Sequence, residues 1–237
     1  SMTLDGASKN NYTLITPTGL VANITAKPLT ILGTFTSDDK IYDGLVEAAI
    51  TTSNLSLSGI ISGDVVGLNT LAVFADPDKG LNKTVSLTSS TLEGVNAGNY
   101  SLNFTGAPTT TASISTKELT VSGGFTALNK VFDNTTSASI NNVTLTLNGV
   151  LPGDDVALTA VAAFPNANVG TGKVVSLTGS TLTGAKAGNY TLSFTGAPTA
   201  TADITKKQLT VNGSFVANNK VYNKTTGASI SNNSLTL

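Results

Sequence analysis

Two aspartates are the first residues whose setting suggests chemistry. Asp64 and Asp154 each follow a glycine in a turn-like sequence, and their positions differ by 154 − 64 = 90. A turn carboxylate can bind calcium, but calcium takes six to eight oxygen ligands and each turn supplies one carboxylate. The short side chain of a turn aspartate also accepts hydrogen bonds from its own turn amides. We expect Asp64 and Asp154 to cap their turns.

A second group of oxygen ligands flanks Pro77. Asp76 and Asp78 resemble a calcium loop, but the matching positions in the second copy are Asn166 and Asn168, which are neutral and weaker ligands. Calcium would then bind one copy and not the other. We expect no metal site and no cofactor.

A Lys–Asn isopeptide bond is another chemistry that these residue types allow, since lysines and asparagines recur in register. It requires a lysine, an Asn or Asp and an acid, all buried in an apolar core. The recurring candidates are Lys40, Lys130, Lys220, Lys83, Lys173, Asn99 and Asn189, with Asp43 and Asp133 as the acids. The alternative is that the lysines are solvated strand ends that discourage edge pairing and that Asn99 and Asn189 are turn residues. We favour this second interpretation.

Composition excludes several classes of function. The chain has no histidine, cysteine or tryptophan and a net charge of −1. No Ser-His-Asp arrangement, cysteine nucleophile or disulfide is available, and no two acids stay together in both copies. We expect no catalytic residue, no nucleic-acid partner and no membrane insertion, because no apolar run approaches the roughly 20 residues of a membrane helix.

Numerous Asn-x-Ser/Thr triplets would be glycan acceptors in a eukaryotic secretory protein. Among them are those that begin at Asn11, Asn23, Asn82, Asn99, Asn134 and Asn189. In a chain rich in Asn and Thr such triplets also arise by chance, so the sequence leaves glycosylation open.

These residues are placed by a repeat of 90 residues. Lys-Pro-Leu-Thr begins at Lys27, Lys-Glu-Leu-Thr at Lys117 and Lys-Gln-Leu-Thr at Lys207, so 117 − 27 = 207 − 117 = 90. Residues 27–116 and 117–206 align without a gap. We expect them to be two full repeats, with residues 1–26 as the tail of a preceding repeat and 207–237 as the start of a following one.

Within a repeat, short runs of alternating apolar residues are separated by turn residues. Leu29, Ile31 and Phe35 alternate with other residues, and so do Tyr100, Leu102 and Phe104. The aromatic residues of this second run, with their copies Tyr190 and Phe194, could stack on sugars or bases, but their period of two predicts the core face of a strand. About seven strands with frequent turns are typical of a small β-sandwich. We predict an all-β fold of tandem β-sandwich repeats, each of immunoglobulin-like size. We expect the last two strands of a repeat, around Tyr100–Phe104 and Ala112–Ile114, to form its closing strand pair.

The apolar residues change from even to odd positions at the junction between repeats. The apolar residues of the last strand have even numbers, Ala112 and Ile114, and those of the next strand have odd numbers, Leu119 and Val121. Since strand side chains alternate between faces, this change predicts a new core. A bulge within one domain is the alternative. With so short a junction, we predict an elongated, fairly stiff rod.

Three motifs in this order resemble a known family. Lys40–Gly44 (KIYDG), Ser62–Asp64 (SGD) and Leu92–Leu102 (LEGVNAGNYSL) are similar to the YDG/MBG-type repeats of large bacterial haemagglutinin-like adhesins, and the resemblance covers almost the whole chain. The second copy has Phe132-Asp133-Asn134 and the third has Tyr222-Asn223-Lys224 in place of Tyr-Asp-Gly. The tyrosine hydroxyl and the glycine are therefore not kept in every copy.

The resemblance implies a structural role at the cell surface. We expect stalk or spacer repeats of a secreted or surface-anchored bacterial adhesin, which project a binding domain and have neighbouring repeats as their partners. The alternative is that the repeats themselves bind a host or bacterial cell-surface glycan or protein weakly, with avidity from repetition. The resemblance supplies no enzymatic residues.

Overall fold

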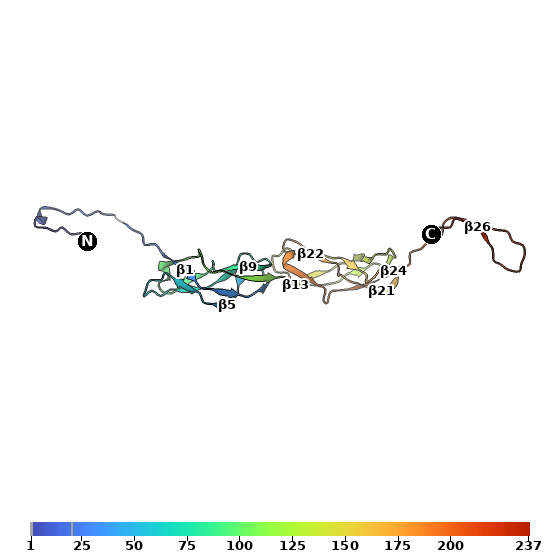
Figure 1. Ribbon diagram of the computed structural model, residues 1–237, viewed down its shortest axis with the longest axis horizontal. Helices are drawn as coiled ribbons and strands as arrows, with labels where there is room; N and C mark the ends of the chain where they lie inside the picture. The colour runs from blue at the N-terminus through green and yellow to red at the C-terminus, as the bar shows by residue number, and fades with distance from the viewer. Residues whose placement is uncertain (1, 20) are drawn as a thin grey trace. The chain divides into compact units, whose positions relative to one another are not determined.

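The computed structural model describes residues 2–19 and 21–237 (Figure 1). The chain divides into two compact units. The first contains the residues up to Lys40 and Leu45–Ile114, and the second contains Ile41–Gly44 and Ser115–Leu237. The division after Ile114 lies close to Lys117, where the second repeat begins in the sequence. One short segment of the first repeat, Ile41–Gly44, is therefore part of the second unit.

Two main sheets form the first unit. In one, β1 (Lys27–Leu32) lies between β11 (Tyr100–Asn103), to which it is parallel, and β6 (Ser56–Ser58), to which it is antiparallel. The other has the order β3 (Lys40–Ile41), β12 (Thr110–Ser115), β9 (Gly80–Ser86), β8 (Ala72–Phe74) and β4 (Glu47–Ala48). Two small pairs complete it: β2 (Phe35–Ser37) with β5 (Ile50–Ser53), and β7 (Gly67–Asn69) with β10 (Thr91–Glu93).

The second unit repeats this plan. Its first sheet places β13 (Lys117–Ser122) between β23 (Tyr190–Ser193) and β18 (Thr146–Asn148). Its second has the order β15 (Lys130–Val131), β24 (Ala200–Thr205) and β21 (Gly170–Val175). The pairs are β14 (Thr126–Ala127) with β17 (Ile140–Asn141), β16 (Ser137–Ala138) with β20 (Ala162–Ala163), and β19 (Ala157–Thr159) with β22 (Thr181–Thr183).

The alternating apolar residues fill the space between the two sheets. In the second unit Val121 of β13 packs in one cluster with Val175 of β21 and Ile204 of β24. Phe125 and Phe164 complete the same core. The predicted all-β tandem repeat is confirmed.

Two details of the strand prediction are wrong. The fully described range 27–116 contains twelve strands rather than about seven, because turns and bulges divide the predicted runs into pieces of two to seven residues. The last two strands were expected to close the sandwich together. Instead β11 pairs with β1, and β12 pairs with β9 in the other sheet.

The change of parity coincides with the division between the units. Ala112 and Ile114 are the buried residues of β12, in the first unit, while Leu119 and Val121 are those of β13, in the second. The chain thus leaves one core and enters the next within a few residues.

The segments before Lys27 and after Lys206 contain local structure that also occurs in residues 27–206. The single 3-10 turn η1 (Lys9–Asn11) precedes Tyr12, as η2 (Ala97–Asn99) precedes Tyr100 and η3 (Ala187–Asn189) precedes Tyr190. At the other end β25 (Phe215–Ala217) pairs with β26 (Ile230–Asn233) in the register of β2 and β5. These pieces form from local sequence.

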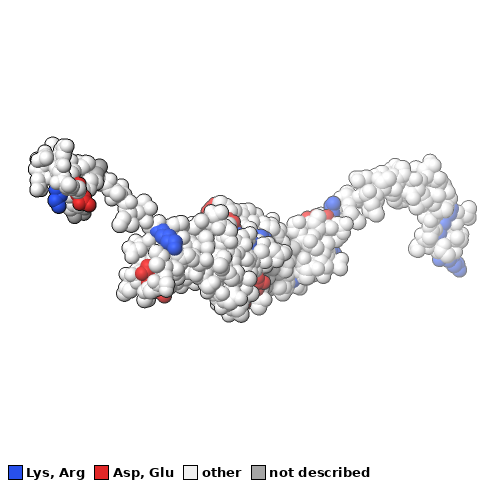
Figure 2. All heavy atoms as spheres, turned by 60° about the vertical axis from the view of Figure 1, so that its left-hand side comes forward, with Lys and Arg blue, Asp and Glu red and all other residues white. Residues whose placement is uncertain are grey.

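Charge is sparse on the surface. Figure 2 shows the described lysines and acids scattered over an otherwise uncharged face. The helices among the described residues are single 3-10 turns of three residues, too short to cross a bilayer.

Candidate functional site

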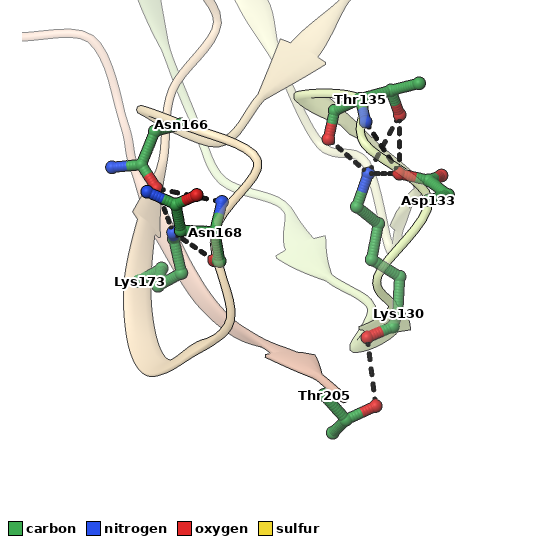
Figure 3. Close-up of polar contacts among 7 residues, drawn as sticks. All are labelled: Lys130, Asp133, Thr135, Asn166, Asn168, Lys173 and Thr205. Atoms are coloured by element: carbon green, nitrogen blue, oxygen red, sulfur yellow. Dashed lines mark hydrogen bonds and ion pairs between the residues drawn. The ribbon is translucent and has the colours of Figure 1, made fainter. Parts of the chain in front are cut away.

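The same aromatic turn occurs in all three copies, at residues 40–47, 130–137 and 220–227, and a lysine closes each one. The Lys40 Nζ donates hydrogen bonds to the carbonyls of Leu45 (2.7 Å) and Glu47 (3.0 Å). In the second copy Lys130 Nζ donates to the Thr135 carbonyl at 2.7 Å, as Figure 3 shows. The third copy forms the same bond from Lys220 to Thr225 at 2.5 Å. The lysine therefore serves to shape the loop.

An Asp or Asn side chain within the turn accepts hydrogen bonds from other residues of the turn. Asp133 Oδ1 accepts hydrogen bonds from Lys130 Nζ at 2.8 Å and from the Thr135 amide at 2.9 Å (Figure 3). The hydrogen bond from Lys130, followed by that from the Thr135 amide, lowers the pKa of Asp133 to about 2. Asn223 accepts from the Thr225 amide at 3.2 Å in the third copy. A carboxylate and an amide thus perform the same structural task.

The next position of the turn has a left-handed backbone. Gly44 has φ = 78°, Asn134 has φ = 63° and Lys224 has φ = 62°. Glycine adopts this region without strain and asparagine tolerates it better than most residues. This requirement explains the glycine of Tyr-Asp-Gly and its replacement by asparagine.

The aromatic turn at residues 40–47 places the side chain of Tyr42 in a pocket of the second unit. Tyr42 is 2% exposed, and its amide donates to the Ser115 carbonyl at 2.9 Å. Its hydroxyl donates to Asp154 Oδ2 at 3.0 Å. The Tyr42 ring meets the Tyr190 ring edge to face, with 5.4 Å between the centroids. All these residues belong to the second compact unit.

We define the Asp154 pocket by Leu151, Asp154, Asn189 and Tyr190. The Tyr190 hydroxyl donates to Asp154 Oδ2 at 2.5 Å and accepts from the Leu151 amide at 3.0 Å. The Asn189 side chain is hydrogen-bonded to the Tyr42 hydroxyl and is 5% exposed. One carboxylate oxygen therefore accepts hydrogen bonds from two phenols.

The electrostatics of the pocket keep both phenols protonated. Burial, followed by the hydrogen bond to Asp154, raises the pKa of Tyr190 to about 12. The same two causes raise the pKa of Tyr42. At neutral pH both hydroxyls act as hydrogen-bond donors. The polar groups of the pocket therefore bind the side chain of a tyrosine.

The first unit contains the same constellation, which we call the Asp64 pocket and define by Ile61, Asp64, Asn99 and Tyr100. The Tyr100 hydroxyl donates to Asp64 Oδ2 at 2.5 Å and accepts from the Ile61 amide at 3.1 Å. A cavity of about 410 Å³ adjoins it, lined by these four residues and by Ile24, Thr25, Ala26, Lys27 and Gly98. None of the three aromatic turns among the described residues contributes to the lining of this cavity.

The predicted role of the two turn aspartates needs correction. Asp64 and Asp154 were expected to cap their own turns, but each accepts a hydrogen bond from a tyrosine hydroxyl that lies 36 residues further along the chain. Sequence reasoning missed this pair. The available signal was that aspartate and tyrosine keep this spacing in both full repeats.

The loops considered for calcium hold a lysine. Asp76 Oδ1 and the Asp78 carbonyl accept hydrogen bonds from Lys83 Nζ, the second at 2.5 Å. Figure 3 shows the counterpart, in which Lys173 Nζ donates to Asn166 Oδ1 and to the Asn168 carbonyl, both at 2.6 Å. The lysine ammonium group lies where calcium would have to bind. It donates the same hydrogen bonds to the Asp loop and to the Asn loop.

Only part of the grouping considered for an isopeptide bond is formed. Lys173 contacts Asn166, whereas Asn189 contacts Tyr42. Lys130 contacts Asp133, whose side chain is 53% exposed. Neither lysine lies with an asparagine and an acid in an apolar core.

Burial separates the candidate glycosylation sites. Asn189 is buried beneath Tyr42, so a glycan on it is incompatible with the folded pocket. The other candidates are exposed: Asn11, Asn23, Asn82, Asn99 and Asn134. The fold therefore leaves those five asparagines accessible to modification.

Comparison with known families finds the same period as the structure. The YDG domain matches the chain twice, over residues 25–112 and 115–201. No curated protein and no solved structure matches the chain. The two matches together cover most of the sequence and agree closely with the two repeats. The chain belongs to the YDG domain family and contains two of its domains in tandem.

Proposed function

We propose that this chain is a structural spacer: YDG repeats in the stalk of a secreted or surface-anchored bacterial adhesin, which hold a separate binding domain away from the cell. The role is mechanical and not enzymatic. It is supported by the tandem YDG domains and by the use made of the first aromatic turn.

One observation carries the proposal. The segment Ile41–Gly44 of the first repeat is part of the second unit, where Tyr42 is buried against Asp154 and Tyr190. In repeat proteins, stability comes from each repeat and from its interface with its neighbour. A repeat that completes the core of the next one suits an array whose task is to transmit orientation.

The polar side chains also favour a spacer over a ligand-binding module. Asp154 accepts hydrogen bonds from two tyrosines, and the lysines Lys130 and Lys173 donate to carbonyls of their own loops. These groups are used to hold the fold together. The face shown in Figure 2 has few charges with which to attract a partner.

Distance measurements between introduced cysteines test the mechanical role. The natural chain lacks cysteine, so Val95→Cys with Ala185→Cys gives two unique labels at equivalent exposed positions of the two repeats. We expect a narrow distribution of label distances by pulsed electron resonance, and a broader one after Tyr42→Ala. A distribution that is broad already with Tyr42 present contradicts a stiff spacer.

Binding assays decide between a spacer and repeats that bind a ligand themselves. The chain is applied to a glycan array and to bacterial and host cells. The spacer role predicts no saturable binding. Saturable binding to a glycan or cell-surface protein would instead support weak binding made strong by repetition.

A further inference from the structure

We propose that the Asp64 pocket is a binding site for the aromatic turn of a second copy of this chain, which inserts Tyr222. Copies would then join head to tail. The inference needs only the geometry of the pocket and does not depend on the spacer role.

The pocket is built like one that holds a tyrosine. In both, a tyrosine hydroxyl donates to aspartate at 2.5 Å: Tyr100 to Asp64, and Tyr190 to Asp154. In both, a backbone amide donates to that hydroxyl, at 3.1 Å from Ile61 and at 3.0 Å from Leu151. The acceptor that receives Tyr42 in the second unit is therefore already formed in the first.

The surroundings of the two pockets differ in burial. Asn189 is buried where Tyr42 covers it, but its counterpart Asn99 is exposed beside the cavity. Leu151 is partly buried, while its counterpart Ile61 is 55% exposed. An apolar wall, a phenol and a carboxylate thus face an open space of about 410 Å³.

Tyr222 is the residue of this chain that fits the space. Of the five tyrosines, Tyr42, Tyr100 and Tyr190 are buried in the two units, and Tyr12 does not lie in an aromatic turn. Tyr222 is 83% exposed, and Lys220 closes its turn as in the other copies. The remaining aromatic turn presents Phe132, which has no hydroxyl for Asp64.

The contact would be heterologous, because the pocket and the tyrosine are different surfaces of one chain. Heterologous contacts that do not close a ring produce open chains of subunits. We therefore expect a ladder of species rather than a single dimer as concentration rises.

Sedimentation velocity over a range of concentrations tests the association. The natural chain should sediment faster as concentration rises, whereas Tyr222→Ala should remain monomeric. Tyr12→Ala is the matched control, since Tyr12 is also an exposed tyrosine near an end of the chain, and it should behave like the natural chain. Equal sedimentation of all three proteins overturns the proposal.

Disulfide trapping tests the location. In the filled pocket a Cβ placed on Gly44 would lie 3.4 Å from Leu151 Cδ1, and the corresponding pair in the proposed contact is Lys224 and Ile61. Single variants Ile61→Cys and Lys224→Cys, one of them carrying a size tag, are mixed and oxidised. The mixed disulfide should form many times faster than between Lys224→Cys and Val95→Cys, which lies outside the pocket. Equal rates would place Tyr222 elsewhere and refute the site.

Discussion

The hydroxyl of Tyr42 donates a hydrogen bond of 3.0 Å to Asp154, a residue 112 positions further along the chain. The same carboxylate oxygen accepts a hydrogen bond from the hydroxyl of Tyr190. Two tyrosines from different repeats therefore share one acceptor within one compact unit. This arrangement gives the Tyr-Asp-Gly sequence a physical task.

Removing the Tyr42 side chain should destabilise the second unit. Tyr42→Ala empties a buried aromatic site, which costs about 3–5 kcal/mol of unfolding free energy. Tyr42→Phe keeps the ring packing and loses a hydrogen bond, at about 1 kcal/mol. Urea denaturation followed by NMR signals of each unit measures both values. Tyr12→Ala, at an exposed position, should change stability by less than about 0.5 kcal/mol.

Asp154→Ala should cost more stability than the matched change Asp64→Ala. Loss of Asp154 leaves the hydroxyls of Tyr42 and Tyr190 without their acceptor, at about 1–3 kcal/mol for each buried group. Loss of Asp64 affects Tyr100, whose pocket is open to water. Thermal melting of the two variants gives the comparison. Equal losses would mean that Tyr42 does not depend on Asp154.

Substitution of Gly44 should follow the left-handed backbone at this position. Gly44→Asn should be tolerated, because Asn134 holds the same conformation with φ = 63°. Gly44→Val should destabilise the second unit by at least about 1–2 kcal/mol, since a left-handed backbone is costly for residues with a Cβ and worse for β-branched ones. Melting temperatures of the two variants provide the check, and a destabilised Asn variant would contradict the conformational explanation.

Stability should fall at high pH because of Tyr190. Its folded pKa of about 12 is above the ordinary value of 10.0, so the protonated phenol is favoured in the folded state. This contribution is complete below about pH 10 and is lost as pH rises towards 12. Unfolding free energies measured from pH 9 to 12 should show the decline. Tyr190→Phe, which cannot ionise, should show a shallower one.

Stability should also fall at low pH because of Asp133. Its folded pKa of about 2 is below the ordinary value of 3.8, so the ionised carboxylate is favoured in the folded state. The contribution is present above about pH 4 and is lost as pH falls towards 2. Asp133→Asn copies the Asn223 of the third turn and should remove this part of the acid dependence. An unchanged acid limb would show that the Lys130 contact does not stabilise the unit.

Much of the fold could be predicted because it is local and periodic. Leu119, Val121 and Ile204 are buried as the period of two indicates, and the change of parity coincides with the division into units. What failed was strand pairing. A period of two identifies the buried face of Tyr100–Asn103, but it says nothing about whether that strand pairs with β12 or, as the structure shows, with β1.

The candidate site was harder to predict for the same reason. Asp154, Asn189 and Tyr190 are candidates from the sequence, whereas Leu151 is not. Tyr42 and Asp154 lie in different repeats, and alignment of the repeats hides contacts that cross from one to the next. The sequence also does not show which polar groups form hydrogen bonds with each other. Lys173 and Asn166 satisfy each other in the structure, so they did not need the ligand or cross-link that their residue types allow.

The direction of the Tyr42 contact has a consequence for biosynthesis. A chain is made from its N-terminus, so Tyr42 leaves the ribosome well before Asp154 and Tyr190. When Asp154 and Tyr190 are made, the turn that carries Tyr42 is therefore already present in the chain, and hydrogen bonds from Lys40 are available to hold its shape.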